Sequence, residues 1–243
     1  LICTLPFFLA VLSSEIVFAN ILISRVRCSE RIGWTFCEKW KNSGMGNKYV
    51  IVLTACINPG KMIHTSLTDV DIRRRQYEDA LEFYLLQTDY PIVFVENSGT
   101  DISGDFRKFV DCGRLEFVTF QGNEEFDRKK GKGYGEALIL EYALEHSLFV
   151  HQCDFLVKIT GRLKLLNVNS MMGFHRYILP HCDIQSEMDR RERYSDSRML
   201  ITDKGFLQHS FLARKERIDD SKGCNFEPVS YTHLRAHETL MNL

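Results

Sequence analysis

The chain has few of the residues that mark specialised protein classes. Only five prolines and fifteen glycines occur in 243 residues, which excludes a collagen-like or low-complexity protein. Lysine and arginine total 31 against 32 acidic residues, so no basic excess points to nucleic acid or an anionic membrane. The eight cysteines include no Cys-x-x-Cys pair, which argues against a disulfide scaffold or zinc ribbon. These absences favour a globular protein with reduced thiols, and we expect it in the cytoplasm.

The first 44 residues differ in character from the rest. Residues 1–24 are apolar and long enough to span a bilayer, but Glu15 and Asn20 interrupt them and the basic residues come afterwards. A secretory signal or a type II anchor would carry its positive charge on the N-terminal side. We therefore interpret residues 1–44 as an upstream extension, with a membrane anchor as the alternative.

The other end of the chain also departs from the middle. Residues 229–239 read VSYTHLRAHET, which matches the translation of a transposase adapter used to build sequencing libraries. We expect residues 229–243 to be foreign to the fold, and the natural protein to continue beyond Pro228. His233 and His237 are spaced like a metal pair but are expected to carry no function. The credible core is then one domain, residues 45–228, truncated at its C-terminus.

Apolar segments alternate with helical segments through this core. Continuous β-branched runs predict strands buried on both faces, and apolar residues at helical spacing predict helices between them. The strands are expected at Tyr49–Cys56, Pro91–Val95, Leu115–Phe120 and Cys153–Ile159, and the helices at about 68–87, 103–112 and 133–147. This alternation predicts a three-layer α/β/α fold with a mostly parallel sheet. In such a fold, ligands bind beyond the C-terminal ends of the strands.

Three loops at that edge carry chemistry. The segment KKGKGYGE at 129–136 places glycines and lysines before a helix, where backbone N–H groups favour a phosphate; a solvated basic loop is the alternative. Glu96 and Asn97 close the second strand, where they could hold a ribose or base, or simply form a turn. Lys158 and Arg162 alternate at the end of the fourth strand and suit a polyanionic ligand. The six histidines of the core show no ligand spacing, so no metal site is predicted there.

These segments, in this order, resemble bacterial GT-A-like glycosyltransferases that build capsular or lipopolysaccharide sugars. The resemblance rests on YVIVLTACINPG, PIVFVENSG, LEFVTFQGN, GKGYGEALILEYALEHS and FLVKITGR, and on the later DSR at 196–198 and IDDSKGCNFE at 218–227. It covers about residues 48–227, and no single motif decides it. It implies a Rossmann-like nucleotide-binding half and transfer of a sugar from a nucleotide-sugar to a glycan or lipid-linked acceptor. It also leaves open a peripheral association with the inner face of the membrane.

The resemblance assigns roles to particular residues. For donor binding it implies Thr54, Ala55, Asn58, Glu96, Asn97, Lys132, Gly133, Lys158 and Arg162. For the acceptor base it implies a residue of the C-terminal half, with Asp196, Asp220 and Glu227 as candidates. A histidine expected beside Glu227 is replaced by Pro228, so the recorded chain could lack part of its acceptor site.

The sequence departs from the family at its metal site. The fourth strand of the family normally ends in Asp-x-Asp, which holds a divalent cation on the diphosphate, whereas this chain reads KITGR. Magnesium or manganese therefore stays open as a cofactor. We hypothesise that Lys158 and Arg162 replace the charge of the metal. Two other functions remain as alternatives: a sugar nucleotidyltransferase, and a non-catalytic nucleotide-binding module on the same fold.

Overall fold

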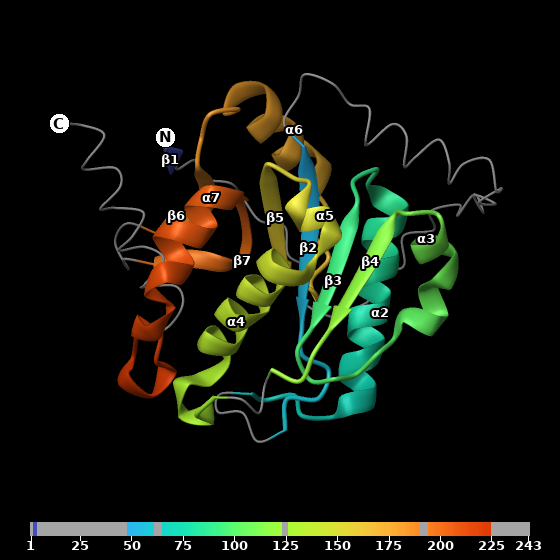
Figure 1. Cartoon of the computed structure of the whole chain (residues 1–243), viewed down its shortest axis with the longest axis vertical. Coiled ribbons are helices and arrows are strands. Elements are labelled where there is room, and N and C mark those ends of the chain that lie inside the picture. Colours follow the sequence, from blue (N-terminus) through green and yellow to red (C-terminus); the bar gives the residue numbers. More distant parts are fainter. Residues whose placement is uncertain (1, 4–47, 61–64, 123–125, 190–193, 225–243) are drawn as a thin grey trace.

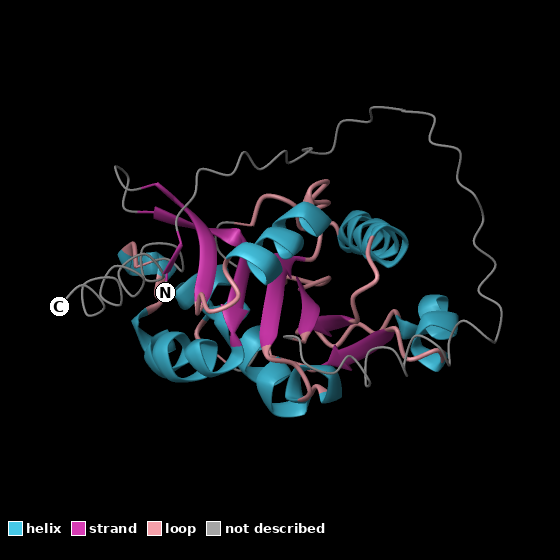
Figure 2. Ribbon diagram, turned by 90° about the horizontal axis from the view of Figure 1, so that it is seen from above, coloured by secondary structure: helices cyan, strands magenta, loops and turns pink. Residues whose placement is uncertain are grey.

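The protein folds around one sheet with helices on both faces. The computed structural model describes residues 2–3, 48–60, 65–122, 126–189 and 194–224. Figure 1 shows the sheet, and the view from above in Figure 2 shows helices on either side of it. The expected three-layer α/β architecture with a mostly parallel sheet is confirmed. Of residues 1–44, only 2 and 3 belong to the described part, and residues 229–243 lie outside it.

Within the described residues, the sheet has seven strands in the order β1-β6-β7-β5-β2-β3-β4. The strands are β1 (Ile2–Cys3), β2 (Tyr49–Ala55), β3 (Ile92–Glu96), β4 (Leu115–Thr119), β5 (Phe155–Thr160), β6 (Ile184–Asp189) and β7 (Tyr194–Asp203). β7 is antiparallel to both of its neighbours, and the other neighbouring strands pair in parallel. Every residue of β2 and β3 is buried, as the continuous apolar runs predicted.

The longer helices connect the parallel strands. The α-helices are α2 (Val70–Gln87), α3 (Arg107–Asp111), α4 (Gly131–His146), α5 (Leu148–His151), α6 (Val168–Ile178) and α7 (Lys204–Phe206). Shorter helical turns are η1 (Ser103–Phe106), η2 (Arg128–Lys130), η3 (Leu207–Phe211), η4 (Leu212–Arg217) and η5 (Asp220–Lys222). Helix α2 begins after Asp69, whose carboxylate accepts from the Ile72 N–H as an N-cap.

Each face of the sheet has its own apolar core. Helices α2 and α6 cover one face, where Leu81 and Met172 pack with Leu53 of β2. Helix α4 covers the other face, where Leu140 packs with Val52. Alternate residues of β2 thus point into opposite cores.

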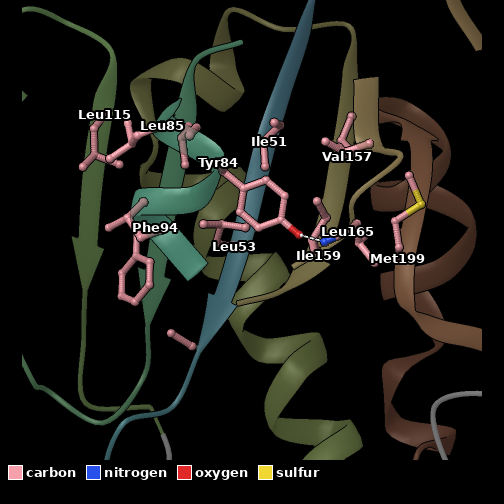
Figure 3. Packing of buried hydrophobic residues seen from close by; sticks show 14 of the residues in the cluster. Ile51, Leu53, Tyr84, Leu85, Phe94, Leu115, Val157, Ile159, Leu165 and Met199 are labelled. Carbon is pink, nitrogen blue, oxygen red and sulfur yellow. Dashed lines mark hydrogen bonds between the residues drawn. The ribbon is translucent and has the colours of Figure 1, made fainter. Parts of the chain in front are cut away.

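A tyrosine ties the first core to the chain that follows β5. The Tyr84 hydroxyl accepts from the Leu165 N–H at 3.0 Å (Figure 3). It also donates to the Leu163 carbonyl at 2.8 Å. Desolvation by burial raises the pKa of this phenol well above its ordinary value. Its two hydrogen bonds satisfy the hydroxyl that α2 carries into an apolar interior.

The region after β5 is more regular than the sequence predicted. Residues 165–228 are polar with short apolar runs and gave no clear period, yet they form α6, β6 and β7. Strand β7 lies beside β5 and extends the sheet, with Met199 opposite Ile159. Within the described residues, no helix is both long and apolar enough to cross a membrane.

Candidate functional site

The sheet reverses its direction of growth between β2 and β5. The chain adds β3 and then β4 on one side of β2, and returns to place β5 on the other side. The C-terminal ends of β2 and β5 lie side by side there, with Thr54 opposite Thr160. Such a switch point is where open α/β sheets bind ligands, because the loops diverge to opposite faces and leave a crevice.

Gly161 closes the turn at the end of β5. Its N–H donates to the Thr54 carbonyl at 2.9 Å. A Cβ at this position would lie 2.8 Å from the same carbonyl oxygen and 3.2 Å from the Tyr77 ring. The close approach of backbone to backbone therefore requires glycine here.

A buried ion pair joins the switch point to α4. Lys158 of β5 is fully buried, and its ammonium lies 2.5 Å from Oε1 of Glu136. The Thr54 hydroxyl donates to the same oxygen at 2.9 Å, and Lys158 also donates to the Ser197 carbonyl. The three elements β2, β5 and α4 are thus held together by one carboxylate, and the positive charge of Lys158 is balanced inside the protein.

Arg162 lies on the opposite face of the sheet from Lys158. The strand ends at Thr160, and Arg162 lies in the turn after it. Its guanidinium donates to the Gln76 Oε1 at 3.2 Å and lies 5.9 Å from the centre of the Tyr77 ring, both on α2. The structure therefore separates the two cations that the sequence analysis placed together, because the extended alternation stops before Arg162.

The loop after β2 is fixed by hydrogen bonds as well as by the fully buried Ile57, which belongs to the apolar core. Arg73 of α2 is buried and donates to the carbonyls of Cys56, Ile57 and Leu67. The Ala55 carbonyl accepts from the Asn97 N–H at 3.1 Å. Asn58 is exposed, and its Oδ1 accepts from the Gly60 N–H at 3.2 Å.

Glu96 organises two loops from within. It is fully buried, and its two oxygens accept from the backbone N–H groups of Ile57, Ser98 and Thr100 and from the Ser98 hydroxyl. Burial raises the pKa of this carboxyl, and the hydrogen bonds from Ser98 and Ile57 oppose the rise. These four donors occupy both oxygens of Glu96, which was expected to contact a base or ribose. Glu96 instead holds the loops after β2 and β3 against each other.

Asn97, by contrast, has hydrogen-bonding capacity to spare. The residue is 2% exposed, yet its Oδ1 has no hydrogen-bond partner among the residues that the structure describes. Its amide lies against α4, since a Cβ on Gly135 would be 3.7 Å from Nδ2. A buried oxygen without a donor is costly, so this position suits a ligand that brings a hydroxyl or N–H.

Helix α4 begins at the same end of the sheet (Figure 1). Lys132 is exposed, whereas Gly133 is buried. Gly131 has a φ of 80°, and the carboxylate of Asp220 lies against its Cα, 3.5 Å from the Gly133 nitrogen. Lys130 lies 2.6 Å from Glu216 and 4.0 Å from the centre of the Tyr134 ring. The helix thus begins at Gly131, two residues earlier than predicted, so the segment expected to precede it forms its first turns, and acidic side chains of the same protein lie at its start.

Glu187 of β6 and Asp196 of β7 are close enough for their charges to interact. They lie where these two strands extend beyond the end of β5. Asp196 is 4% exposed and is held by Arg198, whose Nε lies 3.0 and 2.8 Å from its two oxygens. Glu187 lies at a register shift between Ser186 and Met188, a bulge of the kind that re-aims side chains. Its buried Oε2 has no hydrogen-bond partner in the described part of the chain. Desolvation raises the pKa of Glu187, and the charge of Asp196 raises it further.

The remaining predictions concern the metal and the last acid. The described segments contain no group of three or more His, Cys, Asp or Glu side chains that could hold a metal ion. Glu227 lies outside the described residues.

The sequence analysis did not single out Glu136 or Glu216. Each follows from a rule that could have been applied: a lysine inside an apolar strand needs a buried carboxylate, and a basic loop often has an acidic partner. The sequence alone could not choose which of 32 acidic residues would supply it.

Comparison with known proteins adds little. No family model matches the chain, and no curated protein matches it in sequence. Among the solved structures that match is the crystal structure of 4-diphosphocytidyl-2C-methyl-D-erythritol synthase, at 11% identity over 81% of this chain and 99% of that chain. The TM-score is 0.36, which is too low to carry an inference about the site.

Proposed function

We propose that the protein is a transferase that binds a nucleotide-sugar at the switch point between β2 and β5 and passes the sugar to a glycan or lipid-linked acceptor. One observation carries the proposal: Glu136 fastens the first turns of α4 to the ends of β2 and β5. A phosphate-binding helix start is thereby held beside the crevice where α/β sheets bind ligands.

The diphosphate of the donor would lie at the start of α4. The backbone N–H groups of this first turn and the exposed Lys132 offer positive potential there. Lys158 and Arg162 serve the site indirectly in this proposal. Lys158 positions α4 through Glu136, and Arg162 lines the α2 side of the crevice.

The nucleoside would lie between the loops that follow β2 and β3. Thr54 and Ala55 shape this position through their backbone, and Asn58 is exposed at its rim. The unpartnered Oδ1 of Asn97 would accept from a ribose hydroxyl or a base N–H. Glu96 keeps both loops in place and does not touch the ligand.

The acceptor would approach from the β6–β7 side. Asp196 is fully engaged by Arg198, and Asp220 faces α4, so neither presents an oxygen ready to take a proton. Glu187 has such an oxygen and a raised pKa. Two neighbouring carboxyls in different environments are the arrangement that general acid–base chemistry uses. We therefore assign the acceptor base to Glu187, with Asp196 and Arg198 positioning it.

A donor panel tests the proposal. The chain is assayed with UDP-, GDP- and CMP-sugars for sugar release or transfer, and its thermal stability is measured with each nucleotide. We expect one nucleotide class to raise the melting temperature and its sugar to be released. Lys132→Ala should weaken that binding about tenfold, whereas Lys164→Ala, a surface lysine 3.9 Å from Asp79, should not change it.

The same panel separates the alternatives. Pyrophosphate release from a nucleoside triphosphate and a sugar phosphate would identify a nucleotidyltransferase instead. Stabilisation by a nucleotide without turnover would identify a binding module. Activity that disappears with EDTA and returns with Mg²⁺ or Mn²⁺ would show that a metal, and not the protein's own cations, balances the diphosphate. If no nucleotide stabilises the chain, the proposal fails.

A further inference from the structure

Two carboxylates of one short segment reach the start of α4. Glu216 at the end of η4 accepts from Lys130 and from the Tyr134 hydroxyl, each at 2.6 Å. Asp220 at the start of η5 lies against Gly131. The hydrogen bond from Lys130 holds the pKa of Glu216 below its ordinary value, so the side chain is charged at neutral pH. The two negative charges thus lie at Lys130 and at the helix start where the proposed function puts the diphosphate.

A tight turn holds Asp220 against the start of α4. Asp219 and Cys224 form a small antiparallel bridge with backbone hydrogen bonds of 2.7 and 3.0 Å. Gly223, with a φ of 71°, and the cap that Asp219 makes to the Ser221 N–H close the turn between them. A Cβ on Gly131 would overlap the Asp220 carboxylate, so glycine at this position leaves the space that the carboxylate fills.

A second observation, on the next turn of α4, points to a ligand. Asn97, 2% exposed and packed against Gly135 on the next turn of α4, has an Oδ1 with no donor among the described residues. The acidic segment neutralises the basic part of the site but does not supply a donor to Asn97. A nucleotide brings both an anion for the start of α4 and a hydroxyl or N–H for Asn97.

We propose that Glu216 and Asp220 act as an internal competitor, occupying the diphosphate position until a ligand with two phosphates displaces them. The inference rests on the phosphate position of the proposed function and adds its regulation. It also specifies the ligand class: a diphosphate replaces two carboxylates, whereas a single phosphate replaces one and leaves the other in repulsion with it.

The contacts of the competitor are of a kind that a ligand can break. The Glu216 side chain is 66% exposed, and exposed ion pairs contribute little to stability. The distance of 3.5 Å from Asp220 to the Gly133 nitrogen is long for a hydrogen bond. For a ligand to displace the two carboxylates, η5 must move away from α4 with Asp220, and the Glu216 side chain must rotate. Lys215, which pairs with Glu141, keeps η4 on α4 meanwhile.

Binding of inorganic pyrophosphate and orthophosphate tests the competitor. Isothermal titration is done on the full chain, on Asp220→Asn, on Glu216→Gln and on the control Asp111→Asn, an exposed acid on α3. We expect pyrophosphate to bind about tenfold more tightly to Asp220→Asn and several-fold more tightly to Glu216→Gln. The gain for orthophosphate should be smaller, and Asp111→Asn should match the unaltered chain. Thermal melts confirm that each variant is folded.

The outcomes separate this inference from the proposed function. Equal or weaker pyrophosphate binding in both Asp220→Asn and Glu216→Gln overturns the competitor, as does failure of every chain to bind pyrophosphate. If sugar transfer occurs while the variants bind no more tightly, only the competitor is wrong. If pyrophosphate binding rises but no nucleotide-sugar is used, only the transferase is wrong.

Discussion

The ammonium of Lys158 lies 2.5 Å from Oε1 of Glu136, and this ion pair joins strand β5 to helix α4. Lys158 is fully buried, whereas the Glu136 side chain is 18% exposed. A lysine in that position must be paired, because the desolvation of a lone charge costs several kcal/mol. The residue that looked from the sequence like a phosphate ligand therefore has a structural partner of its own.

Replacing Lys158 by Met should destabilise the protein by about 3 kcal/mol, because Glu136 loses its counter-charge inside a partly buried site. The double variant Lys158→Met/Glu136→Leu should recover part of that loss, since both charges then leave together. Lys164→Met, at an exposed pair 3.9 Å from Asp79, should cost under about 0.5 kcal/mol. Urea denaturation measures all three, and a double variant as unstable as Lys158→Met would contradict the assigned pairing.

Gly161→Ala should destabilise the fold by about 1–3 kcal/mol and weaken nucleotide binding, because its Cβ would push against the Thr54 carbonyl and open the switch point. Gly173→Ala is the matched control. Gly173 lies inside α6 with nothing within 4 Å of the added Cβ, so alanine should stabilise that helix by about 0.5–1 kcal/mol. Thermal unfolding compares the two, and equal effects would show that no close approach is needed at Gly161.

Glu187→Gln should lower the rate of sugar transfer about 100-fold while the affinity for the nucleotide stays unchanged, because a glutamine cannot take the acceptor proton. Initial rates and thermal shifts with the same donor measure the two quantities. Ser186→Ala, a neighbour whose hydroxyl bonds Ser195 at 2.9 Å, is the control for damage to the hairpin. A wild-type rate in Glu187→Gln would remove this residue from the chemistry.

The parts of the fold that have a distinctive local residue pattern were predictable from the sequence. The contacts of the site residues were not predictable. Continuous apolar runs suffice to locate β2 and β3, because burial on both faces demands them. Strands β6 and β7 escaped prediction because β7 turns polar beyond the end of β5, around Asp196 and Arg198. The site residues fail for a different reason. Whether Lys158 or Glu96 faces a ligand depends in part on distant partners. Glu136 is 22 positions from Lys158 and Ile57 is 39 positions from Glu96, and one sequence does not reveal such pairings.

The last prediction concerns His175, which is fully buried at the other end of the sheet, with Nδ1 2.8 Å from the Tyr49 hydroxyl and Nε2 3.3 Å from the Cys182 carbonyl. Desolvation lowers the pKa of its imidazole below the ordinary value of 6.5, and the bond to Cys182 opposes the shift only in part. The unfolded chain therefore binds a proton more readily than the folded chain, so the free energy of unfolding should be full above about pH 6.5 and fall as the pH drops below it.

Urea denaturation at pH 7.5 and 5.5 should show this loss in the unaltered protein and in His209→Gln, whose residue is exposed. His175→Gln should be less stable at pH 7.5. Its free energy of unfolding should fall less on acidification, because no imidazole is buried at that position to take up a proton. An equal pH dependence in His175→Gln would assign the acid sensitivity to other groups.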